Sequence, residues 1–243
     1  MRYLKILFFF IFFWYPTLVK AVVKNDTTTT LHIIFKNTAN HKKITLRDSI
    51  YATPAGEKYT VTKLKYYISN IQLGENTLND PENFQLISEP VNTSFRIPVK
   101  PGTYPHISFL LGIDSLYNCV GAQEGVLDPM NDMFWTWNSG YVMFKLEGIS
   151  ENSVADKNRI EHHLGGYRNN QKIATPITLS FTDPLYIKIG EQKELTIILD
   201  LDQYWNSKNK ILITEKPVCT LPGELARTIA ANFIHMFSIE NVR

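Results

Sequence analysis

Hydrophobic and polar residues alternate along several short segments of the chain. In LHIIFKN (31–37), Leu31, Ile33 and Phe35 fall on one side of an extended strand. The segments ITLSFTD (177–183) and LTIILDLD (195–202) repeat this pattern. A period of two residues is typical of strands with one buried face. Less regular strands are expected in KLKYYISNIQL (63–73), FRIPV (95–99), HISFLLGI (106–113) and YVMFKLEG (141–148).

Turn residues separate these segments, as in TPAG, KPGTYP, LGGYRNNQ and TDPL. Many short strands at this spacing predict a mainly β fold, namely an antiparallel β-sandwich with Greek-key-like connections; a barrel is the alternative. Pro98 favours a sheet edge or a bulge for its strand. The last stretch (222–240) spaces Leu225, Ile229 and Phe233 as a helix does. We therefore expect one C-terminal amphipathic helix that packs on the sheets.

The first 21 residues have the pattern of a secretory signal peptide. Arg2 and Lys5 precede a short apolar run (6–14), and Val19 and Ala21 suit the positions before a cleavage site. The run is shorter than the roughly 20 residues that a membrane span needs. We expect cleavage after residue 21, with an uncleaved anchor as the alternative. The mature chain, 22–243, is then a single exported domain in the periplasm, on the cell surface or secreted, with no stable membrane span.

Composition excludes several classes of protein. Of the 243 residues, 44% are hydrophobic and 20% are charged, which indicates a folded core rather than disorder. The net charge is +2 and no dense basic stretch is present, so nucleic acid is not an expected partner.

The chain has two cysteines, Cys119 and Cys219. In an oxidising compartment they are expected to form a disulfide, and a role as a soft copper ligand is the alternative.

Trp135 and Trp137, in NDMFWTWNSGYVMFKLEG (131–148), lie two residues apart. In an extended segment they share one face, about 6.5–7 Å apart. From composition alone, two such aromatic side chains are expected to cover a core.

The six histidines match no zinc spacing: His32, His41, His106, His162, His163 and His235. His162 and His163 would face opposite sides of a strand. In GVLDPMNDM, the oxygen atoms of Asp128, Asn131 and Asp132 are available to calcium, but the spacing matches no EF-hand, and turn formation is the favoured interpretation.

Met130 and Met133 flank this loop and are either soft copper ligands or packing residues. Hydrolase and phosphate-binding signatures are absent from the sequence, so we expect no enzyme activity.

Several phrases in a fixed order resemble the exported copper-binding MbnP-like family, named for the methanobactin-associated protein. They are KLKYYISNIQL, PVKPGTYPHISFLLGIDSLYN, GVLDPMNDMFWTWNSGYVMFKLEG, HHLGG and IAANFIHMF. The resemblance extends from about Leu31 to Val242, and the block MFWTWNSGY with its following EG is its most specific part.

This resemblance implies a copper site that includes an oxidised tryptophan. In such proteins a di-haem enzyme of the cytochrome c peroxidase type oxidises a tryptophan to kynurenine, whose aromatic amine joins histidine nitrogens on copper. An indole nitrogen has no lone pair to offer a metal, whereas an aniline nitrogen has one. By this resemblance Trp135 is the first candidate for oxidation and Trp137 the alternative. His163, in HLGG, is the best-matched ligand.

The sequence departs from this pattern at one point. No histidine lies between Met130 and Ile160, so the missing ligand is expected to come from His32, His162 or elsewhere in the chain. Tyr141 is expected to support the ligands by hydrogen bonding. The alternative function is a metal-free binding or interaction module of the cell envelope.

Overall fold

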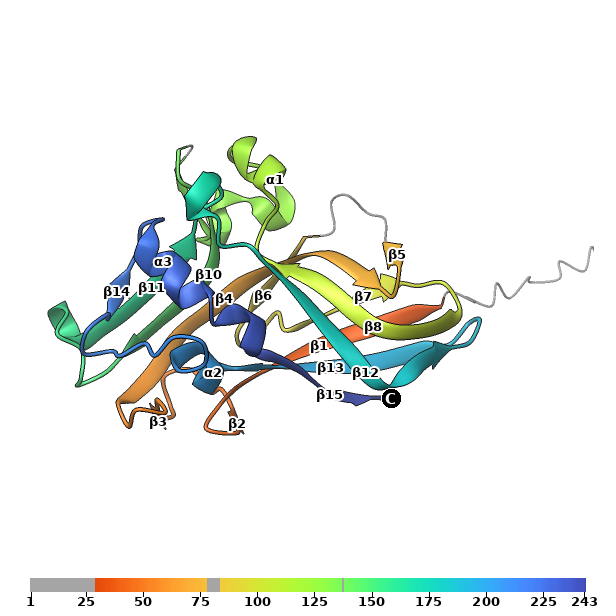
Figure 1. Cartoon of the computed structure of the whole chain (residues 1–243), viewed down its shortest axis with the longest axis horizontal. Coiled ribbons are helices and arrows are strands. Elements are labelled where there is room, and N and C mark those ends of the chain that lie inside the picture. Colours follow the sequence, from red (N-terminus) through yellow and green to blue (C-terminus); the bar gives the residue numbers. More distant parts are fainter. Residues whose placement is uncertain (1–28, 78–83, 137) are drawn as a thin grey trace, which may run out of the picture.

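Two β-sheets that pack against each other make up the fold (Figure 1). The computed structural model describes residues 29–77, 84–136 and 138–243. The expected signal peptide and Trp137 lie outside these residues. In the described part of the chain, no helix is both long and apolar enough to cross a membrane.

The smaller sheet has five strands and the larger has ten, counted over the described residues. The smaller contains β1 (Thr30–Ala39), β2 (Lys42–Lys43), β7 (Ser94–Pro98), β13 (Gln192–Asp200) and β15 (Phe237–Val242). The larger contains β3 (Tyr51–Ala52), β4 (Lys58–Leu73), β5 (Asn76–Thr77), β6 (Gln85–Ser88), β8 (Gly102–Leu111), β9 (Phe134–Thr136), β10 (Gly140–Ile149), β11 (Arg159–Gly165), β12 (Thr175–Ile187) and β14 (Val218–Cys219).

The helices are short. They are α1 (Ser115–Cys119), α2 (Leu201–Trp205), α3 (Glu224–Ala230) and the 3-10 turns η1 (Gly125–Leu127), η2 (Pro129–Asn131), η3 (Asp156–Asn158), η4 (Asn169–Gln171) and η5 (Phe233–His235).

The predicted β-sandwich is confirmed, but its sheets are mixed rather than wholly antiparallel. Strand β1 pairs in parallel with β13, and β11 pairs in parallel with β14. The other strand pairs of the two sheets are antiparallel, such as β10 with β4 and with β11. Side chains alternate with a period of two in both arrangements, so the sequence pattern does not distinguish them.

The core lies between the sheets and is rich in aromatic rings. Phe35 on β1 meets Tyr66, Phe95, Phe109 and Phe237 with ring centroids 5.9–6.4 Å apart. The contact with Phe95 is stacked and the other three are edge-to-face. Both arrangements add to the stabilisation that burial alone provides.

The predicted C-terminal helix is present but ends early. Helix α3 contains Leu225 and Ile229, whereas Phe233 falls in η5. Asn232 separates the two: its amide donates to the main-chain oxygens of Tyr204 and Asn209 at 2.9 and 2.8 Å. After this point the chain becomes extended and β15 completes the smaller sheet beside β13.

Candidate functional site

Strand β11 places the two neighbouring histidines on opposite faces of the larger sheet. Its burial alternates, with Ile160, His162 and Leu164 buried and Glu161 and His163 partly exposed. On the central strand β10, Lys145 lies opposite His163 and Glu147 lies opposite Glu161. The outer face of this sheet thus carries the polar residues, and the inner face belongs to the core.

On the outer face, a carboxylate orients the His163 ring. Nε2 of His163 lies 2.9 Å from Oε1 of Glu147, and a second carboxylate, on Glu161, is 3.9 Å away. The hydrogen bond from His163, together with the charge of Lys63, lowers the pKa of Glu147. With Nε2–H donated to the carboxylate, Nδ1 is the nitrogen whose lone pair is available to a ligand. A metal-binding histidine commonly has this arrangement.

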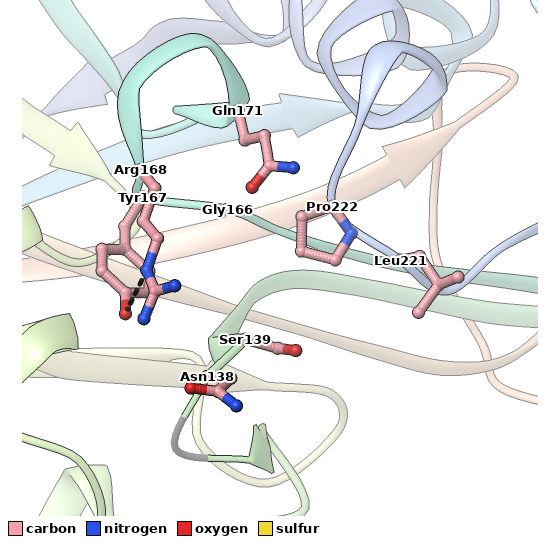
Figure 2. A pocket seen from close by; sticks show the side chains of 8 residues that line it. All are labelled: Asn138, Ser139, Gly166, Tyr167, Arg168, Gln171, Leu221 and Pro222. Atoms are coloured by element: carbon pink, nitrogen blue, oxygen red, sulfur yellow. Dashed lines mark hydrogen bonds between the residues drawn. The ribbon is translucent and has the colours of Figure 1, made fainter.

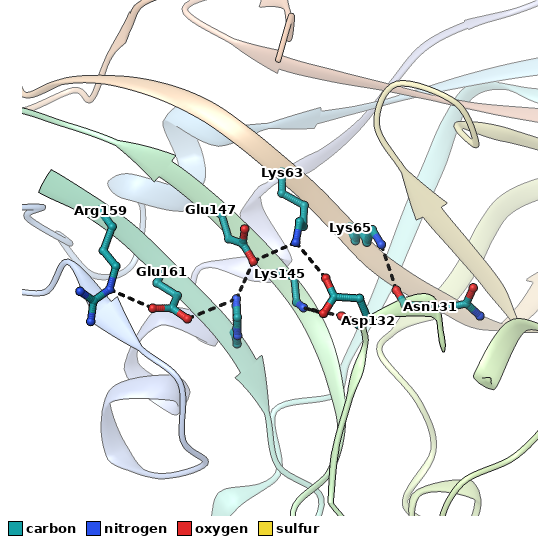
Figure 3. Close-up of polar contacts among 9 residues, drawn as sticks. Lys63, Lys65, Asn131, Asp132, Lys145, Glu147, Arg159 and Glu161 are labelled. Carbon is teal, nitrogen blue, oxygen red and sulfur yellow. Dashed lines mark hydrogen bonds and ion pairs between the residues drawn. The ribbon is translucent and has the colours of Figure 1, made fainter. Parts of the chain in front are cut away.

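A network of ion pairs continues from Glu147 across the outer face, as Figure 3 shows. Lys63 Nζ lies 3.3 Å from Glu147 and 2.8 Å from Asp132. Lys145 Nζ lies 3.1 Å from the other oxygen of Asp132, and Lys65 donates to the main-chain oxygen of Asn131 at 2.9 Å. Partial burial acts to raise the pKa of Asp132, but the two lysines outweigh it and hold that pKa at about 2.

The loop that contains Asp132 is built by turn chemistry, as its sequence predicted. The Asp128 carboxylate accepts from the Met130 main-chain N–H at 2.8 Å, and the Asn131 amide donates to main-chain oxygens of the preceding turn. Met133 is fully buried, whereas Met130 is exposed. Met133 belongs to a second core cluster, whose buried residues are Tyr67, Phe84, Leu86, Ile113, Leu127, Met133, Tyr141 and Val142.

The ring of Trp135 lies against Gly165, on the same strand as His163. A Cβ at Gly165 would come within 2.5 Å of Trp135 Cζ3 and 2.4 Å of the Tyr141 main-chain oxygen, so only glycine fits there. Trp135 is partly buried and packs against the second core cluster. Gly165 follows His163 by two residues, and side chains two apart on a strand share a face, roughly 6.5–7 Å apart. The structure therefore brings Trp135 and His163 to one surface.

His162 has a different environment. It is fully buried, with Nδ1 2.6 Å from the Tyr204 hydroxyl and Nε2 2.7 Å from the Lys216 main-chain oxygen. Burial lowers its pKa to about 4. Both ring nitrogens are therefore in hydrogen bonds inside the core, away from the His163 face.

His32 lies in the other sheet. It belongs to β1, and its Nδ1 lies 3.4 Å from a carboxylate oxygen of Glu194 on the neighbouring strand β13. The structure does not bring His32 together with His163.

Tyr141 supports the surrounding loop. Its buried hydroxyl lies 2.8 Å from the main-chain oxygen of Leu127 and 3.1 Å from that of Gly121, and it accepts from the Gln123 N–H at 3.2 Å. These contacts fix the loop that precedes the Trp135 strand.

The two cysteines, which both lie in the described part of the chain, are free thiols rather than the expected disulfide. Cys119 is exposed at the end of α1, whereas Cys219 is buried on β14 beside His162. Burial raises the pKa of Cys219 to about 11, so its thiol stays protonated at neutral pH.

A pocket of about 240 Å³ opens beside the tryptophan block (Figure 2). It lies between the turn after β9, the segment after β11 and the loop before α3. Arg168 projects into this region with its Nε 3.0 Å from the Tyr167 hydroxyl and its guanidinium over the Tyr167 ring. The other lining residues are Asn138, Ser139, Gly166, Gln171, Leu221 and Pro222.

Sequence reasoning identified His163 and Trp135 but missed Glu147, Gly165 and Arg168. Glu147 carried a signal, since it is the acidic residue of YVMFKLEG and lies on the strand next to His163. Among the described residues, no three His, Cys, Asp or Glu side chains gather in a group that could hold a metal ion.

Comparison with known proteins places the chain in context. A family model described as MbnP matches residues 28–221. Among solved structures, MbnP from Methylosinus trichosporium is similar, with a TM-score of 0.54 and 13% identity over 79% of this chain and 83% of that chain. At this identity the similarity concerns the fold alone. The search of curated proteins finds no match.

Proposed function

The chain belongs to the MbnP family, and from this premise we propose that it is an exported, non-enzymatic copper-binding protein. The observation that carries the proposal is the shared outer surface of Trp135 and His163. Gly165 allows the tryptophan ring to lie on the strand that carries the histidine. A target for oxidation and a carboxylate-oriented imidazole thus lie on the same face of β11.

The residues fit copper when the tryptophan is oxidised. His163 would supply Nδ1, because Glu147 accepts the Nε2 proton and fixes the ring. The indole of Trp135 has no lone pair for a metal, and its conversion to kynurenine would create an aromatic amine that has one. Imidazole and amine nitrogens suit copper. Trp137 remains the alternative target, and it lies outside the described residues.

The oxidation requires a partner, for which we propose a di-haem peroxidase of the cytochrome c peroxidase type. Two molecules of hydrogen peroxide each give one oxygen atom to the indole, and each is reduced to water. The C2–C3 bond breaks to give N-formylkynurenine. Water then releases the former C2 carbon as formate, which leaves kynurenine with a free aromatic amine. The side chain loses one carbon and gains one oxygen in total.

Mass spectrometry tests this proposal on protein purified from its native envelope or made beside the di-haem partner. We expect the mass change of kynurenine on the peptide that contains Trp135 and Trp137, with fragmentation assigning it to Trp135. Bound copper is then measured after dialysis against a copper-buffered solution. Two unmodified tryptophans together with the absence of copper would contradict the proposal.

Variants separate the two parts of the site. His163→Ala is expected to lose copper but keep the mass change, because it removes a ligand and not the target of oxidation. Trp135→Phe is expected to lose both. His106→Ala is the matched control, since His106 is a partly exposed strand histidine on β8 in the same sheet, and it is expected to keep both.

The alternative is a metal-free binding module, and the pocket beside Arg168 favours it. Its lining offers a guanidinium, amides and a hydroxyl to a small polar ligand. Loss of a bound small molecule in Arg168→Ala, with copper binding absent in both proteins, would support this second function.

A further inference from the structure

A cluster of aromatic side chains surrounds His162 on the inner side of the larger sheet. Tyr204 and Trp205 come from α2 and Tyr59 comes from β4. All four side chains are almost completely buried. The ring centroids of His162 lie 5.9 Å from Tyr204 and 5.7 Å from Trp205. The proposed copper site uses none of these residues.

The direction of the hydrogen bonds at His162 follows from its partners. The Lys216 main-chain oxygen can only accept, so Nε2 carries the proton and donates to it at 2.7 Å. Nδ1 of the neutral ring therefore holds a lone pair, which accepts the Tyr204 hydroxyl proton at 2.6 Å. The phenol of Tyr204 is thus directed at a base inside the core.

Other buried tyrosines do not meet a base. Tyr66 is fully buried as well, but its hydroxyl donates to the side-chain oxygen of Asn37 at 2.8 Å. The Tyr67 hydroxyl donates to the Val126 main-chain oxygen. An imidazole nitrogen is a much stronger base than an amide oxygen, so of these three hydroxyls only that of Tyr204 has an acceptor that can take its proton when the phenol is oxidised.

A row of aromatic rings extends from Tyr204 to Tyr51, which lies near the exposed strand β2. Ring centroids are 5.0 Å apart between Tyr204 and Trp205, 5.4 Å between Trp205 and Tyr59, and 5.9 Å between Tyr59 and Tyr51. The Tyr51 hydroxyl lies 3.4 Å from the main-chain oxygen of Lys43, on the exposed strand β2. Trp205 Nε1 and Tyr59 Oη are buried without a hydrogen-bond partner of good geometry.

We propose that Tyr204 is a redox-active tyrosine whose one-electron oxidation is coupled to transfer of its phenolic proton to His162. The oxidant is an outer-sphere one-electron acceptor at the protein surface. One electron leaves Tyr204 along Trp205, Tyr59 and Tyr51. The O–H bond breaks and an N–H bond forms at Nδ1, which gives a neutral tyrosyl radical and an imidazolium. Return of one electron reverses both transfers.

Basicity decides where the proton goes, since both groups lie in the core. An oxidised phenol that keeps its proton is a much stronger acid than an imidazolium, so the proton moves over one short hydrogen bond to Nδ1 of His162. Tyr204 is then a neutral radical, and the imidazolium donates to both the Tyr204 oxygen and the Lys216 carbonyl. The chain therefore has a second oxidisable site, on the opposite face of β11 from Trp135 and independent of copper.

Electron paramagnetic resonance tests the proposal on the full-length protein. Photogenerated tris(bipyridine)ruthenium(III), with a cobalt(III) ammine as the final electron acceptor, supplies the one-electron oxidant. We expect a tyrosyl signal in the wild-type protein that is lost in Tyr204→Phe. Tyr66→Phe is the matched control, because it removes an equally buried hydroxyl whose partner is not a base, and it is expected to keep the signal.

A measurement without substitution keeps the test valid if Tyr204→Phe does not fold. In wild-type protein grown with ¹⁵N-histidine, the radical is expected to show a hyperfine coupling to one imidazole nitrogen. Formation of the radical is also expected to slow in D₂O, because the proton moves with the electron. A tyrosyl signal that lacks the ¹⁵N coupling, or that persists in a folded Tyr204→Phe, would overturn the proposal. So would a protein in which the oxidant yields no tyrosyl radical.

Discussion

His162 and His163 are neighbours in the sequence, yet the two faces of β11 place them in opposite environments. The inner ring is fully buried and has both nitrogens in hydrogen bonds with Tyr204 and Lys216. The outer ring is partly exposed and has one nitrogen directed at Glu147 within a network of charges. One strand thus supplies a histidine bound only within the core and a histidine available to ligands.

The difference shows how two adjacent histidines on one strand can have two chemical roles, a proton acceptor in the core and a proposed metal ligand at the surface. Successive side chains of a strand point to opposite faces, so a pair of histidines always divides between them. On the inner face, desolvation keeps His162 neutral and hence a proton acceptor for Tyr204. On the outer face, Glu147 and the lysines keep the surface polar and water-accessible, which suits metal exchange and access by a partner enzyme.

Replacing each histidine by alanine is expected to produce the largest contrast. His162→Ala opens a cavity in the core and leaves the Tyr204 hydroxyl and the Lys216 oxygen without their partner. We expect it to lower the free energy of unfolding by about 4 kcal/mol. His163→Ala removes only a partly exposed hydrogen bond to Glu147, so the expected loss is below about 1 kcal/mol. Urea denaturation measures both, and equal losses would contradict the division between the faces.

The same two faces are expected to lose stability in different pH ranges. An unfolded histidine has a pKa of about 6.5, whereas that of His162 is lowered to about 4 by burial. Between these values the unfolded state binds more protons, so stability falls as the pH falls from 6.5 towards 4, by up to about 3 kcal/mol. Unfolding free energies across this range give the measurement.

Asp132, on the outer face, is expected to respond at lower pH. Asp132 has its pKa held at about 2, below its usual value, so its contribution is present near pH 4 and above and is lost as the pH falls towards 2. Asp132→Asn should therefore leave the change between pH 6.5 and 4 intact, whereas His162→Asn should remove it. If Asp132→Asn abolished that change, the assignment to His162 would be wrong.

The sequence predicted much of the fold because alternation is a local signal. The burial pattern of β1 confirms the face assigned to Leu31, Ile33 and Phe35. It did not predict that β1 pairs in parallel with β13, because that pairing joins segments from opposite ends of the chain. The spacing of Leu225 and Ile229 predicted α3, but its end depends on hydrogen bonds that Asn232 makes to distant main-chain atoms.

The candidate site was predictable in part because the alternation of side chains along a strand is a local signal. The alternation rule placed His162 and His163 on opposite faces, but only the packing shows which of them faces the core. The tryptophan pair raised a choice between core packing and a metal ligand, and Trp135 has features of both: it packs on the second core cluster and remains partly exposed. The role of Glu147 depends on strand pairing between β10 and β11, which the sequence pattern does not specify.

The contact between Trp135 and Gly165 allows a smaller and more local test of the outer face. In Gly165→Ala, the new Cβ would meet the tryptophan ring at 2.5 Å and the Tyr141 oxygen at 2.4 Å. We expect a loss of about 1–3 kcal/mol, typical of overpacking, together with a changed near-ultraviolet circular dichroism signal as the indole moves. Gly102→Ala is the control, since its Cβ would meet nothing closer than 3.4 Å.

Gly165 also sets the position of Trp135 on the face that carries His163. Gly165→Ala should therefore slow the oxidation of Trp135 while leaving the hydrogen bond between Tyr204 and His162 unchanged. A variant that keeps wild-type stability and wild-type circular dichroism would show that the indole does not rest on Gly165, and the shared surface would lose its structural basis.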